Sequence, residues 1–291
     1  MFPSAGTNRA VAKQGLFLLL YPAKTSPGTA MTIERHARLR AARSWGDHYH
    51  FAVDAPALGR EARPGQFVMV KVAAGTVPLL RRPLGIHDAG PEGIELFFKV
   101  AGAGTALLAL KEPGDPLDIL GPLGKGFTVD RGLEGKTAFL VGGGRGIAPL
   151  FFLARALAEA GATPAVFYGG RTAADVPLAD KFAAAGFEVH LSTDDGSLGF
   201  AGFVTALVET EMDRSAPAIV YACGPDPMMK ALAGITARRR VPAEFSLESV
   251  MGCGVGACWG CVHRIRDGGS DGWVKICEEG PVFPGERILW P

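Results

Sequence analysis

Short hydrophobic runs, separated by residues that break regular structure, fill the chain from about residue 32 to residue 132. They include HYHFAVDA, GQFVMVKVAA, IELFFKVAG and GDPLDILGPLG, which are rich in Phe, Val, Leu and Ile and are bounded by Gly, Pro and Asp. Runs of this length and spacing are typical of strands in a small antiparallel barrel. This part of the chain is therefore predicted to form a β-barrel.

Strand patterns then alternate with helical patterns. Residues 136–161, KTAFLVGGGRGIAPLFFLARALAEAG, are predicted to form a buried strand, a Gly-rich turn and a helix. Three further predicted strands follow, TPAVFYGG, FEVHLSTDD and PAIVYACGP, and each has a helical segment after it. This alternation predicts a parallel sheet with both faces covered. Beyond residue 243 the sequence has little periodicity.

The predicted fold is thus a multidomain α+β chain. We expect an antiparallel β-barrel over residues 31–133, an α/β domain with a parallel sheet over 134–243, and a small C-terminal domain over 244–291. Residues 1–30 match none of these patterns, and we expect Met31 to be the native start. The run GLFLLLYPA within them resembles part of a signal peptide, but no convincing small-residue cleavage site follows it.

Four of the five cysteines lie in the C-terminal part, at Cys253, Cys258, Cys261 and Cys277. The spacing C-x4-C-x2-C, with a fourth cysteine after a further fifteen residues, is that of the ligands of a plant-type [2Fe–2S] cluster. Glycines between the cysteines allow the backbone to wrap closely around such a cluster. The alternatives are disulfides and a structural zinc site, but zinc ligands are usually paired in two short C-x2-C segments.

Two Gly-rich turns follow strands of the predicted parallel sheet, one in FLVGGGRGIAPL and one in YACGPDPMM. Such a turn exposes backbone N–H groups at a helix N-terminus, where a pyrophosphate can bind. One turn alone is equally explained as a tight connection. Two turns at the carboxyl ends of strands in one sheet are placed to flank a crevice for a dinucleotide.

Composition limits the classes of partner. The chain has 30 Lys and Arg against 29 Asp and Glu, and its net charge of +1 gives no electrostatic reason to expect a nucleic acid or an anionic membrane. No run approaches the ~18 apolar residues that cross a bilayer. The cysteine pattern favours a reducing, cytoplasmic location over an oxidising exterior.

Taken together, these motifs resemble the ferredoxin–NADP reductase superfamily, in which a small β-barrel precedes a nucleotide domain with G-G-G-x-G-x-x-P-L and a later C-G-P. The segments SLESVMGCGVGACWGCV, TDDGSLG and ACGPDPMMKAL narrow the resemblance to the electron-transfer subunits of type B dihydroorotate dehydrogenases. The likeness extends from about Thr32 to Pro291.

The resemblance implies three cofactors and a partner. FAD would lie on the barrel, NAD(H) would dock on the α/β domain, and the [2Fe–2S] cluster would face a separate catalytic subunit. That subunit would carry FMN and oxidise dihydroorotate in pyrimidine biosynthesis, and the assembly would be a heterotetramer. Electrons would then pass from FMN through the cluster and FAD to NAD+.

The resemblance also implies which residues bind each cofactor. Those for FAD are Arg82, Pro83, Leu84, Gly85, Phe97, Phe98, Lys99, Gly104 and Thr105. Those for the nucleotide are Gly142, Gly143, Gly144, Gly146, Cys223 and Gly224, and the four clustered cysteines are the metal ligands. The family usually has Ser where this chain has Gly85, so a hydroxyl expected near the flavin ring must be replaced by a backbone N–H or by another group.

No set of side chains resembles a nucleophile with its base, so no catalytic residue is predicted, and the protein is expected to position redox cofactors. His48, His50 and His87 are interpreted as ordinary, partly exposed histidines. Asp194 and Asp195 are interpreted as turn residues or nucleotide contacts.

Other functions stay open. An NAD(P)H:ferredoxin oxidoreductase subunit, or the diaphorase subunit of a hydrogenase, would carry the same motifs with another partner. A non-catalytic iron–sulfur redox sensor would not need both the flavin and the nucleotide motifs. Arg171, in YGGRT, would suit the 2′-phosphate of NADP or be a solvated loop residue. Trp259 is either a lid over the cluster or an anchor for a partner.

Overall fold

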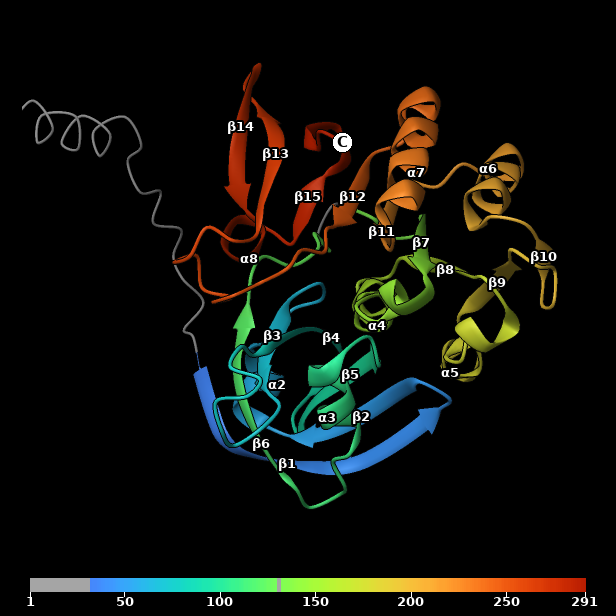
Figure 1. Cartoon of the computed structure of the whole chain (residues 1–291). Helices are drawn as coiled ribbons and strands as arrows, with labels where there is room; N and C mark the ends of the chain where they lie inside the picture. Colours follow the sequence, from blue (N-terminus) through green and yellow to red (C-terminus); the bar gives the residue numbers. More distant parts are fainter. Residues whose placement is uncertain (1–31, 130–131) are drawn as a thin grey trace, which may run out of the picture. The chain divides into compact units, whose positions relative to one another are not determined.

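The computed structural model describes residues 32–129 and 132–291 (Figure 1). The predicted start at Met31 and the segment 1–30 lie outside the described residues. Contacts group residues 31–291 into a single unit, and the boundaries of the three predicted domains within it stay a prediction.

Six antiparallel strands close a barrel in the order β1-β2-β5-β4-β3-β6. They are β1 Thr32–Trp45, β2 His48–Asp54, β3 Phe67–Lys71, β4 Arg82–Gly90, β5 Gly93–Lys99 and β6 Pro116–Leu123. Successive side chains of a strand point to opposite faces, and the inward ones form the barrel core, for example Phe51, Val68, Val70, Leu96 and Phe98. The barrel predicted from the hydrophobic runs is confirmed.

Two short helices that the sequence pattern did not predict interrupt the barrel strands, α2 Pro56–Glu61 and α3 Ala103–Ala109. The hydroxyl oxygen of Thr105 accepts hydrogen bonds from the backbone N–H groups of Ala101 (2.9 Å) and Gly102 (3.2 Å). These bonds fix the turn by which the chain passes from β5 into α3.

A seven-stranded sheet has the order β10-β9-β8-β7-β11-β12-β15. Its strands are β7 Thr137–Gly143, β8 Thr163–Gly170, β9 Glu188–Thr193, β10 Phe200–Ala201, β11 Ile219–Cys223, β12 Ala243–Ser246 and β15 Val282–Pro284. The connections are η1 Gly144–Ile147, α4 Leu150–Glu159, η2 Ala173–Asp175, α5 Ala179–Ala184, α6 Val204–Arg214 and α7 Asp226–Arg239. All neighbouring strands are parallel except the pair of β12 and β15.

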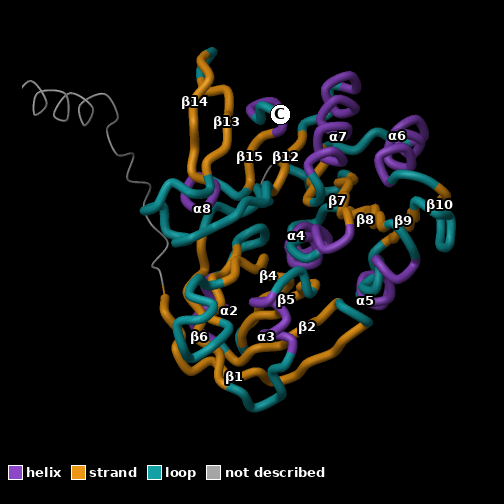
Figure 2. The backbone as a smooth tube through the Cα atoms, in the orientation of Figure 1, coloured by secondary structure: helices purple, strands orange, loops and turns teal. Residues whose placement is uncertain are grey.

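Helices cover both faces of this sheet (Figure 2). Phe139 and Val141 of β7 share a core with α6 and α7, whereas Ala138 and Leu140 share a core with α4 and α5. Strand β7 is therefore hydrophobic on both faces because neither face reaches water. The predicted α/β part of the fold is confirmed.

The sequence beyond residue 243 has little periodicity, yet the structure forms regular elements there. The chain forms β12, a hairpin of β13 Val262–Asp267 and β14 Ser270–Lys275, the short helix α8 Ile276–Glu279, β15 and η3 Gly285–Arg287. Residues of this part, including Cys261, Ile265 and Cys277, belong to the same core cluster as Met69 of β3 and Phe245 of β12. The C-terminal part thus packs against both the barrel and the sheet.

None of the helices in the described ranges combines the length and the hydrophobicity that crossing a bilayer requires.

Candidate functional site

The structure brings the four clustered cysteines together at the C-terminal edge of the core. Cys261 and Cys277 are each 2% exposed, whereas Cys253 is half-buried and Cys258 is exposed. The N–H of Cys277 donates to Sγ of Cys261 (3.4 Å), and the N–H of Val255 donates to Sγ of Cys253 (3.4 Å). All five cysteines of the chain are free thiols. The predicted disulfide alternative therefore has no support in the structure.

Backbone N–H groups of the loop point at these sulfurs. The N–H of Gly256 donates to Sγ of Cys277 (3.1 Å), and the N–H of Gly260 donates to Sγ of Cys258 (3.4 Å). Burial raises the pKa of Cys253, but hydrogen bonds from backbone amides outweigh it and lower that pKa to about 6. Such N–H···S bonds stabilise thiolates, so the loop fits an anionic cluster held by sulfur.

A group of candidate phosphate donors lies where β4 begins. The guanidinium of Arg82 rests against the first turn of α3, because a Cβ on Gly104 would lie 2.1 Å from Nε of Arg82. A larger residue at position 104 would displace the guanidinium from this place. A guanidinium beside backbone N–H groups is a favourable donor set for a pyrophosphate, so these residues fit the diphosphate of a flavin dinucleotide.

The other predicted flavin residues differ in which of their groups are accessible to a flavin. The side chain of Phe98 lies in the barrel core, and that of Phe97 packs on the other face of β5 against His48, with ring centroids 5.7 Å apart. Both phenyl rings are buried, so mainly backbone groups of this strand are available to a flavin. At Gly85 a Cβ would meet nothing closer than Pro149, at 3.8 Å. A serine would therefore fit there, and glycine is not required by packing.

A cavity of about 610 Å³ opens at the carboxyl ends of the parallel strands. Strand β7 is followed in the chain by β8 and β9 on one side, whereas β11 lies on its other side. Ligands of open α/β sheets bind at such a switch point. The cavity is lined from the sheet by Gly143, Gly170, Asp194, Phe203, Gly224 and Met228, and from the barrel by His48 and Lys99.

The two predicted Gly-rich turns meet at this cavity. A Cβ on Gly146 would lie 2.3 Å from the carbonyl oxygen of Cys223, so glycine is needed for the two turns to touch. Burial raises the pKa of the Cys223 thiol, which stays protonated at neutral pH and packs beside the cavity. Lys99 donates to Asp175 of η2 (2.9 Å), and Nε of Arg171 lies 3.3 Å from the same carboxylate. Acidic and basic groups therefore alternate along the cavity.

Several residues interpreted from sequence take other places in the structure. His87 is fully buried and His48 is 2% exposed, so the interpretation of both as partly exposed was wrong; only His50 is half-buried. Asp195 forms a turn, in which its carboxylate accepts from the N–H (2.9 Å) and the hydroxyl (2.6 Å) of Ser197. Asp194 lines the cavity instead.

Sequence reasoning missed an ion pair at the cavity. Nη2 of Arg145, in the first Gly-rich turn, lies 2.9 Å from the carboxylate of Glu248, which precedes the cysteine loop. The two residues are 103 positions apart. The only indication of Glu248 in the sequence is its place in the segment SLESVMGCGVGACWGCV, which carries part of the family resemblance. The pair links the nucleotide turn to the cysteine loop.

Two family descriptions match this chain. Residues 248–289 match the family described as "Iron-sulfur cluster binding domain of dihydroorotate dehydrogenase B", a range that includes all four clustered cysteines. Residues 140–234 match the family described as "Oxidoreductase NAD-binding domain", a range that includes both Gly-rich turns.

Known proteins resemble nearly the whole of the described chain. The electron transfer subunit of dihydroorotate dehydrogenase B (NAD(+)) from Desulforamulus reducens is 43% identical over 83% of this chain and 92% of the relative. The subunit of the same name from Bacillus caldolyticus is 47% identical over 78% of this chain and 87% of the relative.

Solved structures give a similar result. One titled "Insights into flavin-based electron bifurcation via the NADH-dependent reduced ferredoxin-NADP oxidoreductase structure" has a TM-score of 0.76 and 32% identity, over 88% of this chain and 91% of that chain. A ferredoxin NADP+ reductase from Neisseria gonorrhoeae with bound FAD and NADP has a TM-score of 0.59 and 18% identity, over 72% and 92%. The second likeness shows the fold alone.

The first prediction concerns Arg82. Arg82→Ala should lower FAD affinity about tenfold to a hundredfold, because a charge-assisted bond to phosphate contributes about 1.5–3 kcal/mol. FAD content after gel filtration and a fluorescence titration measure it. Arg43→Ala, an exposed arginine of β1, is the matched control and should keep FAD. Unchanged FAD affinity in Arg82→Ala would contradict the assignment of Arg82 as a phosphate donor.

The second prediction concerns the sulfur ligands. Cys258→Ser should remove the iron while leaving FAD bound, because the thiolate is lost from the exposed edge of the loop and the barrel is untouched. Iron and flavin contents, with the absorption and reduced-state EPR spectra of the wild type, measure this. Cys223→Ser is the control and should retain two irons per chain, a number set by the cluster type. A wild-type protein with one zinc and no iron would refute the iron–sulfur assignment.

Proposed function

The chain belongs to the family of electron-transfer subunits of dihydroorotate dehydrogenase B (NAD+), and on that premise we propose that it passes electrons between a catalytic dihydroorotate dehydrogenase subunit and NAD+. It is an oxidoreductase subunit of pyrimidine biosynthesis that uses FAD, a [2Fe–2S] cluster and NAD(H). The resemblance predicted from the motifs is confirmed at the level of this family.

One observation carries this function: the three cofactor regions adjoin one another. The cysteine loop touches β3, where a Cβ on Gly254 would lie 2.5 Å from Met69. Met69 is paired with Pro83 on the neighbouring strand β4, in the flavin segment. The nucleotide cavity in turn is bounded by Lys99, from the flavin segment of β5. The flavin segments therefore adjoin both the cysteine loop and the nucleotide cavity.

This arrangement suits the chemistry of the three cofactors. NAD exchanges two electrons as a hydride and the cluster passes one at a time, and a flavin between them can do both. The chain's own residues bind and orient: Arg82 holds a diphosphate, the amides of the cysteine loop stabilise thiolates, and the touching Gly-rich turns admit a nucleotide backbone. No side chain is required to act as a nucleophile or as a general base.

The partner is proposed to be an FMN-containing catalytic subunit in a heterotetramer. Apolar side chains of the cysteine loop support a covered surface there: Val250 is 86% exposed and Trp259 is 58% exposed. Nζ of Lys275 lies 5.0 Å from the centre of the Trp259 ring. More than half of Trp259 is nevertheless exposed, and so is open to a partner. An exposed aromatic of this kind favours the anchor over the lid.

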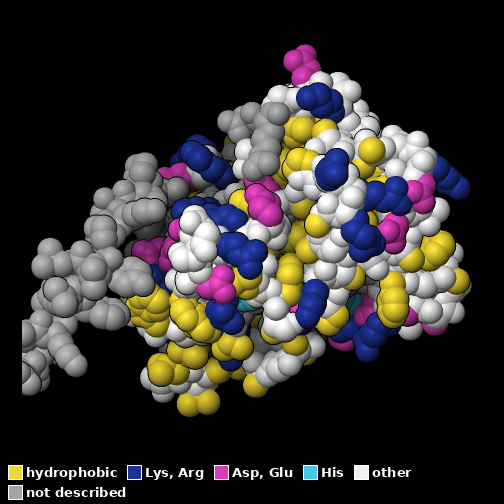
Figure 3. All heavy atoms as spheres, turned by 90° about the horizontal axis from the view of Figure 1, so that it is seen from above, with side chains coloured by type: hydrophobic (Ala, Val, Ile, Leu, Met, Phe, Trp, Pro, Cys, Tyr) yellow, Lys and Arg dark blue, Asp and Glu magenta, His cyan; other side chains and the backbone are white. Residues whose placement is uncertain are grey.

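The compartment is proposed to be the cytoplasm. The spacing of four cysteines fits cluster ligands, and none of the five is paired in a disulfide in the structure, a pattern typical of proteins in reducing compartments. On the face drawn in Figure 3, Lys and Arg side chains are interspersed with Asp, Glu and hydrophobic side chains. A surface of mixed sign gives no reason to propose a nucleic acid or an anionic membrane as partner.

A second function has one observation in its favour. The solved relative with a TM-score of 0.76 is titled as an NADH-dependent reduced ferredoxin-NADP oxidoreductase, which matches the alternative of a ferredoxin-linked subunit. The dihydroorotate dehydrogenase relatives have higher identity, 43% and 47% against 32%. Co-purification from native cells, with identification of the associated chain, separates the two functions.

The third prediction concerns the isolated chain. It should oxidise NADH with ferricyanide as acceptor and show no turnover of dihydroorotate with NAD+, because the described residues offer no base to take a proton from that substrate. Adding an FMN-containing dihydroorotate dehydrogenase subunit should supply the missing reaction. Dihydroorotate oxidation by the isolated, FMN-free chain would contradict the proposal, and absence of NADH oxidation would favour a redox sensor.

The fourth prediction concerns Trp259. Trp259→Ala should weaken binding to the catalytic subunit by about tenfold or more, the effect of removing a central aromatic anchor, with NADH–ferricyanide activity unchanged. Sedimentation or calorimetry measures the binding. Trp273→Ala, whose side chain is 60% exposed on β14, is the matched control. A cluster that decays faster in isolated Trp259→Ala protein, with normal binding, would restore the lid interpretation.

A further inference from the structure

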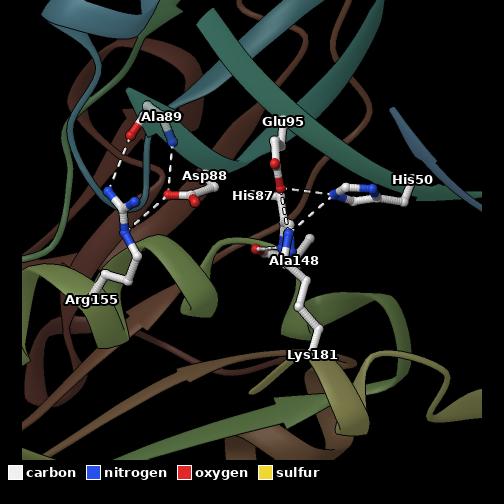
Figure 4. Close-up of polar contacts among 8 residues, drawn as sticks. All are labelled: His50, His87, Asp88, Ala89, Glu95, Ala148, Arg155 and Lys181. Atoms are coloured by element: carbon white, nitrogen blue, oxygen red, sulfur yellow. Dashed lines mark hydrogen bonds and ion pairs between the residues drawn. The ribbon is translucent and has the colours of Figure 1, made fainter. Parts of the chain in front are cut away.

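A second group of metal-ligating side chains lies where the barrel faces the α/β part of the fold (Figure 4). His50 of β2, His87 of β4 and Glu95 of β5 each direct one ligand atom to a common point, and these atoms all lie within 4.8 Å of one another. Nε2 of His50 is 2.9 Å from the carboxylate of Glu95, and the two imidazole centroids are 5.3 Å apart. The three residues come from adjacent strands of the barrel.

His87 is the informative member of this group. The pairing of β4 with β5 has an irregularity between Ile86 and Asp88, and such bulges re-aim a side chain. Nδ1 of His87 donates to the carbonyl oxygen of Ala148 (2.7 Å), which leaves the lone pair on Nε2. Among the described residues, this fully buried nitrogen has no hydrogen-bond partner. Burial also lowers the pKa of His87 to about 3, so the imidazole is neutral and able to bind a metal.

The ammonium group of Lys181 already lies beside these ligand atoms. Nζ of Lys181, on α5, bonds to the carboxylate of Glu95 and lies 3.2 Å from Nε2 of His50. Lys181 is 28% exposed at its side chain, so its long side chain is able to swing into water. The neighbouring carboxylate of Asp88 is different, because it is paired with Arg155 at 3.3 Å.

We propose that His50, His87 and Glu95 form a site for one divalent transition-metal ion of the zinc class, which competes with the ammonium group of Lys181. Two imidazoles and one carboxylate are an established ligand set for Zn2+, with one position left open. With bonds of about 2.0–2.1 Å, tetrahedral ligand atoms are about 3.3 Å apart, so the three ligand atoms, which lie within 4.8 Å of one another, would move closer together on binding. The donation from His87 to a backbone carbonyl is the outer contact that orients metal-binding histidines.

Unlike the lysine, a metal ion at this site would not join the barrel to the α/β part. Lys181 connects the helix α5 to strand β5, whereas all three proposed ligands belong to the barrel. Zinc would therefore release α5 from Glu95 on binding. This inference is independent of the proposed electron-transfer function, because none of its residues belongs to the flavin segment, the nucleotide turns or the cysteine loop.

A zinc titration of the holoprotein tests the proposal. Isothermal calorimetry should show one weak site in the wild type. Lys181→Met should bind Zn2+ about tenfold more tightly, since the competing charge is lost, and Glu95→Gln should bind about tenfold to a hundredfold more weakly. Lys111→Met and Asp88→Asn are the matched controls and should match the wild type. Iron content is followed throughout, so that zinc entering the cysteine loop is detected.

X-ray absorption at the zinc edge identifies the ligands. The expected first shell contains nitrogen and oxygen only, with imidazole scattering that decreases in His87→Phe. His87→Phe retains a ring against Phe151, which His87 stacks on at 5.1 Å; should it fail to fold, Glu95→Gln carries the test. Sulfur in the shell, equal zinc affinity of wild type and Lys181→Met, or no zinc bound by either would overturn the proposal.

Discussion

The pairing of β12 with β15 is the constraint on which the iron–sulfur part of the molecule depends. Phe245 lies opposite Phe283 in this pair, and the two strands enclose the whole cysteine loop and the following hairpin between them in sequence. Backbone hydrogen bonds at both ends of a long excursion fix its position relative to the parallel sheet. Electron transfer needs such fixed distances, and a loop joined at one end only would not provide them.

The parts predicted well from sequence were those set by local pattern. The strand β7, TAFLVGG, is hydrophobic on both faces and is followed by a Gly-rich turn, which makes a buried parallel strand the natural interpretation. The spacing of Cys253, Cys258 and Cys261 is likewise a local feature. β15 could not be predicted, because it has three residues including a proline and exists only through its pairing with β12.

Burial by distant segments explains the remaining errors. His87 sits in a strand of ordinary pattern, and only the arrival of Ala148 and Phe151 from the α/β part buries it. The ion pair of Arg145 and Glu248 could not be predicted from the sequence either, because the fold brings together residues 103 positions apart. Phe97 and Phe98 show a related limit: the resemblance points to their strand, but the alternation of side chains decides that their rings pack into two different cores.

The cysteine loop also has a strong gradient of exposure, from Cys277 in the core to Cys258 at the surface. Oxidation of sulfur follows access, so damage by oxygen would begin at one edge of a bound cluster and not at the other. A subunit docked on that edge would act as a shield. A cell that makes more of this chain than of its partner would accumulate copies with a short-lived cluster. Balanced synthesis of the two chains would therefore limit the iron that is lost from unprotected clusters.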